Sequence, residues 1–185
     1  MASTAPVAVV IMAAGKGTRM RSAVPKVLHT IGGRSLLDHA VAAARGLRPD
    51  HLVVVVRHER DAVVAHLSEV APDAVAADQD ETPGTGRAVA CGLASLPEDL
   101  AGPVVVTSGD VPLLDTATLR ALLAQHVERG DAVTLLTTVL DDPTGYGRVV
   151  READGTVSAI VEQRDARPEQ RAITEINAGV YVFDA

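Results

Sequence analysis

A short apolar run that ends in a glycine-rich turn constrains this chain more than any other feature. Residues 7–12 read VAVVIM, and residues 13–20 that follow read AAGKGTRM. An apolar run of this length before glycines predicts a buried strand of a parallel sheet. Glycines let backbone N–H groups approach an anion, and open α/β sheets bind ligands at the carboxyl ends of their strands. The turn therefore predicts a polyphosphate site in an α/β fold, with cations from Lys16, Arg19 and Lys26.

Composition supports the same fold class and excludes several kinds of partner. Of the 185 residues, 47% are apolar but only 2% are aromatic, so alanine, valine and leucine must fill the core. Valine-rich strands alternating with alanine- and leucine-rich helices suit an α/β layer fold. A formal net charge of −7 argues against nucleic acid as a partner, and no apolar run is long enough to cross a bilayer. One cysteine, Cys91, and the lack of a signal-peptide pattern indicate a reducing cytoplasm.

The order of apolar segments predicts a mostly parallel sheet with helices on both faces. We expect residues 1–6 to form a loose tail and residues 7–185 to form one domain. Because little follows the last strand to cover it, we expect that domain to be incomplete at its C-terminus. The expected strands span residues 7–12, 52–56, 74–77, 103–107, 132–140 and 176–183, with a hairpin of residues 148–152 and 157–162 and a charged loop at 163–174.

Four helices are expected between these strands. Ser35 is a candidate cap for the first, Glu59 begins the second, Gly84 or Thr85 begins the third, and Thr116 begins the fourth, which Gly130 closes. The apolar pattern of the third helix predicts that it buries Val89, Leu93 and Leu96. In the fourth we expect Val127 to face inward with Leu119, Leu122 and Leu123, and His126 to lie on the surface.

The glycine-rich turn matches neither of two common nucleotide-binding motifs. A dinucleotide fingerprint needs a third glycine where Met20 stands, and a Walker loop needs Gly-Lys-Ser/Thr where the chain has Gly15-Lys16-Gly17. From composition alone, a phosphate site and an ordinary solvated basic turn both remain open.

An acidic residue follows another buried strand. The expected strand 103–107 ends in Ser108-Gly109-Asp110, and a carboxylate in that position is costly without a partner. It is either a cap for the next segment or a Mg²⁺ ligand that faces the polyphosphate, since Mg²⁺ takes carboxylate and phosphate oxygens. Other polar residues are less informative about function. Gln79, beside Gly84 and Thr85, could bind the edge of a base or belong to an ordinary surface loop. The pattern alone does not select Gly147, Glu162 or Asn177.

Several motifs in order resemble a known family. AAGKGTRM with PKVLH, GTG at 84–86, GD at 109–110, PTGYGR at 143–148, IVEQRDA at 160–166 and EINAGVY at 175–181 resemble the sugar-nucleotide pyrophosphorylases. The greatest similarity is to the uridylyltransferase domain of bifunctional N-acetylglucosamine-1-phosphate uridylyltransferase/glucosamine-1-phosphate acetyltransferases. It covers the chain from about residue 7 to the end.

The resemblance implies a Rossmann-like three-layer α/β/α nucleotidyltransferase with Mg²⁺ as cofactor. Its implied reaction makes UDP-N-acetylglucosamine and pyrophosphate from UTP and a sugar-1-phosphate, for cell-wall peptidoglycan synthesis. Arg19 and Lys26 would be catalytic, Asp110 would hold the metal, and Gly147, Glu162 and Asn177 would hold the sugar. The residues implied to bind the nucleotide are Ala13, Ala14, Gly15, Lys16, Gln79, Gly84 and Thr85.

The chain also departs from the family. Ser108 stands where the family usually has tyrosine, and Arg87 where it usually has histidine. The resemblance implies that the second protein ligand to magnesium, an asparagine, lies beyond residue 185, as does the acetyltransferase domain through which the family trimerises. Acetyl transfer and trimerisation are therefore not assigned to this chain. Two alternatives stay open: another base or sugar phosphate as substrate, and a truncated nucleotide-binding module without activity.

Overall fold

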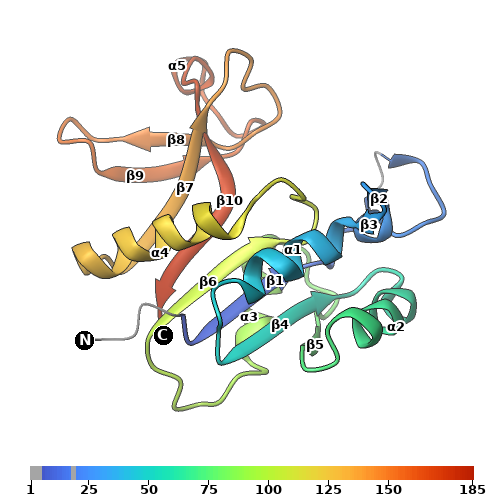
Figure 1. Ribbon diagram of the computed structural model, residues 1–185. Helices are drawn as coiled ribbons and strands as arrows, with labels where there is room; N and C mark the ends of the chain where they lie inside the picture. The colour runs from blue at the N-terminus through green and yellow to red at the C-terminus, as the bar shows by residue number, and fades with distance from the viewer. Residues whose placement is uncertain (1–5, 18–19) are drawn as a thin grey trace. The chain divides into compact units, whose positions relative to one another are not determined.

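The computed structural model describes residues 6–17 and 20–185, so Arg19 lies outside the described residues. The chain divides into two compact units, one of residues 1–134 with 181–185 and one of residues 135–180. Each predicted strand is found with its ends shifted by no more than one residue. Figure 1 shows the elements in chain order.

The first unit is built on a sheet whose central strand follows the tail. β1 (Ala8–Met12) lies between β4 (His51–Val56) and β6 (Pro103–Ser108) and runs parallel to both. β5 (Val75–Asp78) extends the sheet beyond β4, also in parallel. Residues 181–184 of β10 (Glu175–Asp184) pair with β6 in the antiparallel sense. The mostly parallel sheet predicted from the sequence is thereby confirmed, with one antiparallel edge.

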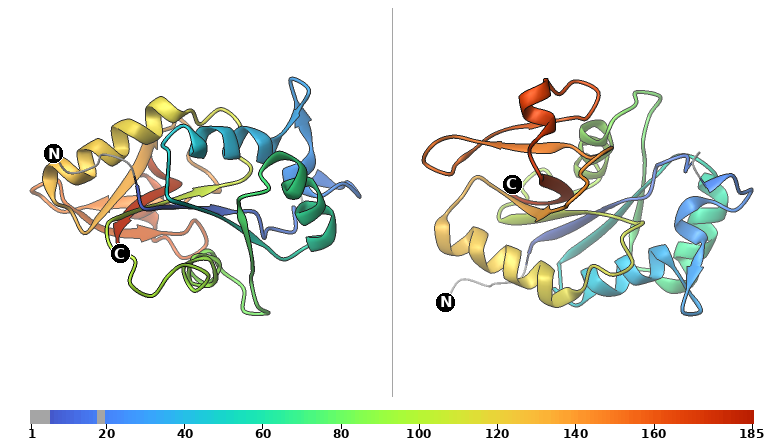
Figure 2. Two further views of the ribbon diagram at one scale, coloured as in Figure 1. Left: turned by 60° about the horizontal axis from the view of Figure 1, so that its bottom comes forward. Right: turned by 90° about the horizontal axis from the view of Figure 1, so that it is seen from above.

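Helices cover both faces of this sheet. α1 (Leu36–Arg45) and α4 (Thr116–Arg129) lie on one face, and α3 (Thr85–Leu93) lies on the other (Figure 2). Because strand side chains alternate, the central strands are buried on both sides, and Val9, Val10 and Ile11 are fully buried. A helix layer on each face of a parallel sheet is the three-layer arrangement that the sequence predicts.

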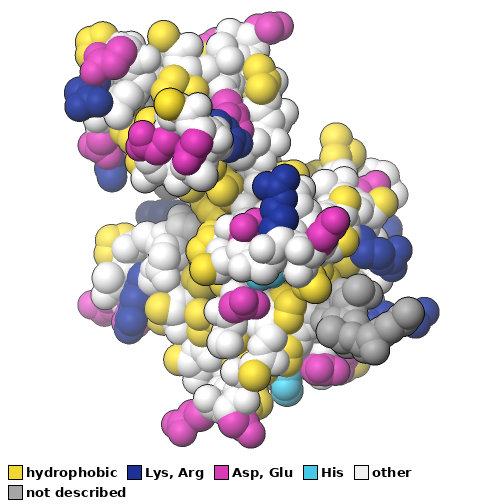
Figure 3. All heavy atoms as spheres, turned by 90° about the vertical axis from the view of Figure 1, so that its left-hand side faces the viewer, with side chains coloured by type: hydrophobic (Ala, Val, Ile, Leu, Met, Phe, Trp, Pro, Cys, Tyr) yellow, Lys and Arg dark blue, Asp and Glu magenta, His cyan; other side chains and the backbone are white. Residues whose placement is uncertain are grey.

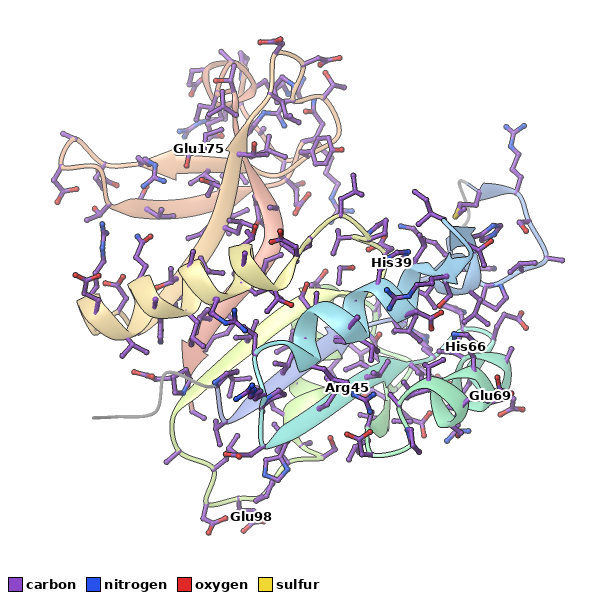
Figure 4. All side chains as sticks on the ribbon, viewed as in Figure 1. His39, Arg45, His66, Glu69, Glu98 and Glu175 are labelled. Carbon is purple, nitrogen blue, oxygen red and sulfur yellow. The ribbon has the colours of Figure 1, made fainter. Side chains whose placement is uncertain are left out.

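The cap predicted at Ser35 forms and joins two helices. The Ser35 hydroxyl accepts the Asp38 amide at 2.9 Å, and the Asp38 carboxylate accepts the Ser35 amide at 2.9 Å, which is a capping box. His66, on α2 (Arg60–Val70), reaches the same pair: its Nε2 lies 2.7 Å from Asp38 Oδ1 and 3.0 Å from Ser35 Oγ. Figure 4 labels His66 on α2. The start of α1 is thus tied to α2.

The prediction of the residues that bury α3 is confirmed in part: Val89 and Leu96 pack against the core, but Leu93 is exposed. Leu93 is 40% exposed, Val89 and Leu96 are only partly buried, and the buried positions are Ala88 and Gly92. A Cβ on Gly92 would lie 2.7 Å from Val10 Cγ1 and 2.9 Å from Val55 Cγ2. The helix therefore approaches the sheet through its small residues, which a search for large apolar side chains overlooks.

On α4 the burial of two neighbouring side chains is the reverse of the prediction. Val127 is 40% exposed, whereas His126 is 1% exposed. The buried imidazole has polar partners: Nδ1 lies 2.9 Å from Thr134 Oγ1, and Nε2 lies 3.4 Å from Asp184 Oδ1. Buried polar groups need such partners. Both partners lie outside α4, and Asp184 is distant in the sequence, so the helix pattern alone could not reveal them.

The second unit carries the predicted hairpin. β8 (Arg148–Arg151) and β9 (Val157–Val161) are antiparallel, and β8 also pairs with β10 at Ile176. The charged loop predicted at residues 163–174 contains a short helix, α5 (Pro168–Arg171), which begins with proline at its first turn.

The remaining elements of the chain are β7 (Val133–Val139), η2 (Lys26–Leu28), β2 (Thr30–Ile31) and β3 (Arg34–Ser35). The last two pair as an antiparallel ribbon in the first unit.

Candidate nucleotide-binding site

The carboxyl ends of β1 and β6 form a pocket in the first unit. The two strands are in register with Met12 opposite Ser108, and the Gly109 amide donates to the Met12 carbonyl at 2.9 Å. The loops that follow the two strands are therefore brought together at one edge of the sheet. The pocket has a volume of about 240 Å³, and it is lined by Met12, Ala13, Gly15, Gly17, Met20, Lys26, Val27, Ser108 and Asp110.

Lys26 and Asp110 meet in this pocket. The Lys26 Nζ donates to Asp110 Oδ2, and the Ser108 hydroxyl donates to Asp110 Oδ1. The side chains of Lys26 and Asp110 are 31% and 24% exposed, so a ligand can still reach them. Burial raises the pKa of Asp110, but the hydrogen bonds from Lys26 and Ser108 outweigh it and hold the pKa below its ordinary value. Asp110 is thus an ionised carboxylate at neutral pH.

The turn between β1 and η2 is shaped around Lys26. Gly17 has a φ of +62°, and a Cβ on it would lie 2.6 Å from Lys26 Cβ. Gly15 has no such constraint, because a Cβ there would meet nothing within 4 Å. Val27, the middle residue of η2, is buried, which anchors the neighbouring Lys26. Glycine at 17 lets the turn pass close to the lysine stem, while Gly15 leaves open space above the turn.

The predicted phosphate-binding residues differ in how accessible they are to a ligand. Ala13 and Ala14 are buried, and the Ala13 amide donates to the Val55 carbonyl at 2.8 Å, so it is not available to a ligand. Lys16 is exposed beside the pocket-lining Gly15. The cation predicted at Arg19 lies outside the described residues. The fixed positive charge that the described structure puts in the pocket is therefore that of Lys26.

The loop predicted to read the base follows β5 at the same edge of the sheet. The Gln79 side-chain amide donates to the carbonyls of Thr82, at 2.9 Å, and Gly84, at 3.3 Å. The Gln79 side-chain oxygen remains as the acceptor that a ligand could use. Gly84 has a φ of +123° and leads directly into α3 at Thr85.

Arg87, the residue that departs from the resembled family, stabilises this loop. Its guanidinium donates to Asp80 Oδ2, with Nε at 2.9 Å, and the Thr82 amide donates to Asp80 Oδ1 at 3.0 Å. The hydrogen bond from Arg87 is the main cause that lowers the pKa of Asp80 to about 2. Two side chains, Gln79 and Asp80, therefore hold the loop that carries Gly84.

The three predicted sugar-binding residues lie together in the second unit. The Asn177 amide donates to the Gly147 carbonyl at 2.9 Å, and a Cβ on Gly147 would lie 3.3 Å from Glu162 Oε1. The Asn177 side-chain oxygen accepts the Gly179 amide at 3.0 Å. A backbone amide segment, a carboxylate and a carboxamide suit sugar hydroxyls, which both donate and accept.

The described residues hold no cluster of three or more histidine, cysteine, aspartate or glutamate side chains that could enclose a metal ion. Asp110 nevertheless suits Mg²⁺, which is commonly held by one or two carboxylates while phosphates and waters complete its shell. Its carboxylate is ionised, partly exposed and set in a pocket with a lysine. The donor set therefore fits a metal that arrives with a polyphosphate, and it does not fit a closed structural site.

Two features of the site were missed by sequence reasoning. The hydrogen bond from Ser108 to Asp110 was not anticipated, although a serine two residues before a strand-end aspartate is a local signal for it. The close approach of Gly17 to Lys26 could not be found from spacing, because Lys26 lies nine positions further along the chain and no local pattern joins the two residues.

The fold and the site together define a class of protein. A solved structure from Bacillus anthracis, of a protein assigned as a glucose-1-phosphate thymidylyltransferase and bound to sucrose, superposes on this chain with a TM-score of 0.77 at 21% identity. The superposition covers 95% of this chain and 70% of that one. At that identity the similarity shows the fold, which is the α/β fold of a nucleotidyltransferase.

Sequence comparison then identifies the family. Residues 9–173 match the MobA-like NTP transferase domain family, and the chain belongs to it. The chain is 58% identical over 180 residues to the bifunctional protein GlmU of Kineococcus radiotolerans, and 59% identical over 179 residues to that of Clavibacter sepedonicus. Each alignment covers 97% of this chain and 36% of the relative, so the chain spans about a third of the length of these relatives.

Two general features accompany this assignment. None of the described helices is both long and apolar enough to cross a membrane. On the face of the molecule shown in Figure 3, acidic and basic side chains are interspersed with apolar ones. The ionic pair of Lys26 and Asp110 is thus a local feature of the pocket on a chain of net negative charge.

Proposed function

We propose that this chain transfers a uridylyl group: it makes UDP-N-acetylglucosamine and pyrophosphate from UTP and N-acetylglucosamine-1-phosphate. The observation that carries the proposal is the Lys26–Asp110 pair, set in a pocket beside a glycine turn at the carboxyl edge of the sheet. Support comes from the high identity to GlmU proteins and from the motifs shared with the resembled uridylyltransferases. The single cysteine fits a reducing compartment, and we place the reaction in the cytoplasm.

The chemistry requires little from the protein in proton transfer. The second pKa of a phosphate monoester is about 6, so the sugar phosphate is already a dianion at neutral pH. One of its oxygens attacks the α-phosphorus of UTP, the bond from that phosphorus to the bridging oxygen breaks, and pyrophosphate leaves. No general base is needed, and the described pocket lining contains neither histidine nor cysteine.

The obstacle to the reaction is the approach of two anions. Catalysis of phosphoryl and nucleotidyl transfer comes from positioning and from neutralising charge. Lys26 carries three N–H donors, so its ammonium can keep Asp110 and also donate to a phosphate oxygen. The turn at Gly15 offers backbone close to the same pocket. We assign a further phosphate contact to Arg19 from the family resemblance.

Mg²⁺ is the proposed cofactor, with Asp110 as the protein ligand. Bound there with the nucleotide, it would withdraw charge from the phosphate oxygens. Ser108 and Lys26 hold the carboxylate in place at the edge of the pocket. Gln79, Gly84 and Thr85 are proposed to hold the uracil, and Gly147, Glu162 and Asn177 are proposed to hold the sugar.

A substrate screen tests the proposal. Purified chain is mixed with each of the nucleoside triphosphates, one sugar-1-phosphate at a time, and Mg²⁺, and released pyrophosphate is measured. We expect release that requires UTP and N-acetylglucosamine-1-phosphate. Faster release with another triphosphate or another sugar phosphate would replace the proposed substrate. Binding of UTP in a calorimeter without any release would identify a nucleotide-binding module instead.

A further inference from the structure

Arg148 is a buried cation that the proposed reaction does not use. It is 2% exposed, at the first position of β8 in the second unit. Within the described residues it forms no direct salt bridge with a carboxylate, although its charge adds to the Thr144 hydrogen bonds that lower the pKa of Asp142. Its Nε is buried without a hydrogen-bond partner. Burying a charge is costly, so its position calls for a physical explanation.

The guanidinium joins the two ends of the hairpin. Nη1 donates to the carbonyl of Tyr146, just before β8, and Nη2 donates to Gln163 Oε1 at 2.6 Å, just after β9. The same Gln163 oxygen accepts the Gly145 amide at 3.4 Å. Arg148 and Gln163 thus tie the loop before β8 to the residues that follow β9.

Each of these two residues is the chain neighbour of a proposed sugar-binding residue. Arg148 follows Gly147, and Gln163 follows Glu162. Successive side chains of a strand point to opposite faces. The contacts agree with this alternation. A Cβ on Gly147 would lie 3.2 Å from Ile160 Cγ2 and 3.3 Å from Glu162 Oε1, on one face of the hairpin. The Arg148 guanidinium contacts Gln163, on the other face.

We propose that Arg148 and Gln163 form a clamp that sets the separation of Gly147 and Glu162, and so positions the sugar subsite from the face opposite to the ligand. The proposal rests on the proposed function, since it takes Gly147 and Glu162 as the residues that hold the sugar. Arg148 and Gln163 are positioning residues: they touch the backbone and one another, not the substrate.

The test removes the acceptor and keeps the side-chain size. In Gln163→Leu, we expect KM for N-acetylglucosamine-1-phosphate to rise about tenfold, the lower end of what losing a hydrogen bond to a charged group costs. KM for UTP should stay within about twofold, as for a change remote from the nucleotide. Gln163→Glu, whose carboxylate can accept from the guanidinium, should restore KM for the sugar phosphate to within about threefold of the parent.

Arg151→Met is the matched control. Arg151 lies on the same strand and pairs with Glu175, with Nε at 2.8 Å and Nη2 at 2.6 Å, but that pair is outside the clamp. Loss of one partly exposed ion pair should change both KM values by less than about twofold. If Gln163→Leu raises neither KM, or raises both equally, the clamp has no specific role at the sugar and the proposal is overturned.

A second measurement does not depend on turnover. The Asn177 amide donates to the Gly147 carbonyl at 2.9 Å, so its hydrogen exchange reports the geometry of the subsite. We expect faster exchange at Asn177 in Gln163→Leu and unchanged exchange in Arg151→Met. Failure of the parent chain to use N-acetylglucosamine-1-phosphate would refute the proposed function, whereas unchanged exchange in Gln163→Leu would refute the clamp.

Discussion

Replacing Gly17 by alanine should distort the pocket through Lys26. The backbone at Gly17 has a φ of +62°, which residues with a Cβ adopt at a cost of roughly 1–2 kcal/mol. The new methyl would lie 2.6 Å from Lys26 Cβ. Lys26 is held in turn by its ion pair with Asp110 and by the buried Val27 next to it. The clash is therefore with the anchored stem of the side chain and not with its flexible end.

The expected magnitude follows from these two terms. Overpacking a well-fitted contact costs about 1–3 kcal/mol, which adds to the backbone term. The turn is at the surface and can relax in part, so we expect the free energy of unfolding to fall by about 2–3 kcal/mol. With a urea dependence of about 2 kcal/mol/M, the midpoint should move down by about 1–1.5 M.

Urea unfolding without nucleotide is the appropriate assay, with Gly15→Ala as the control in the same turn. A methyl on Gly15 meets nothing within 4 Å, so this variant should stay within about 0.5 kcal/mol of the parent. Equal stability of the two alanine variants would show that the contact between Gly17 and Lys26 is not real.

Three further changes have defined outcomes. Gly92→Ala should destabilise the chain by about 1–2 kcal/mol, because the new methyl meets Val10. Gly86→Ala, on the same helix, should be neutral or stabilising by up to about 1 kcal/mol, because a methyl there meets nothing within 4 Å. Thermal unfolding of the two variants shows whether each change in stability has the expected sign. Ser108→Ala should raise the Mg²⁺ concentration needed for half-maximal pyrophosphate release by about tenfold, because Asp110 loses a hydrogen-bond donor; an unchanged titration would contradict this. In Asp110→Asn, the difference in free energy of unfolding from the parent should be constant at neutral pH and shrink below about pH 4. The pKa of Asp110 in the folded chain lies below the unfolded value of 3.8, so its stabilisation is present above that value and is lost as the pH falls through the folded pKa. Unfolding measured at several pH values checks this.

The strands were predictable because their signal is local. Continuous valine runs such as residues 52–56 identify buried parallel strands, and the glycines and prolines between the runs mark their ends. Ser35 was predictable as a cap for the same reason, since the capping box closes within three residues. Helix faces were less predictable: α3 packs through Ala88 and Gly92, and His126 is buried by Thr134 and Asp184. Those outcomes depend on residues outside the helix itself, such as Val10 for α3 and Asp184 for His126.

The residues of the candidate site also differ in whether a local sequence signal points to them. The glycine-rich turn and a strand-end position made Lys26 and Asp110 candidates without deciding their roles, and the structure brings the two side chains into contact. Residue pattern alone did not select Gly147, Glu162 or Asn177, because their proximity is created by the pairing of β8 with β9 and β10. Only the family resemblance pointed to them. Side-chain contacts such as that between Arg148 and Gln163 had no signal in the sequence.

The central claim is that Lys26 acts on the phosphates of a bound nucleotide next to Asp110. Its most direct test is the turnover number of Lys26→Ala for pyrophosphate release, with Arg45→Ala, an exposed ion-pair change at the far end of α1 (Figure 4), as the control. Loss of one electrostatic donor at the reacting phosphates predicts a fall of about 10²-fold or more for Lys26→Ala and little change for Arg45→Ala. A Lys26→Ala turnover number within about threefold of the parent would contradict the account.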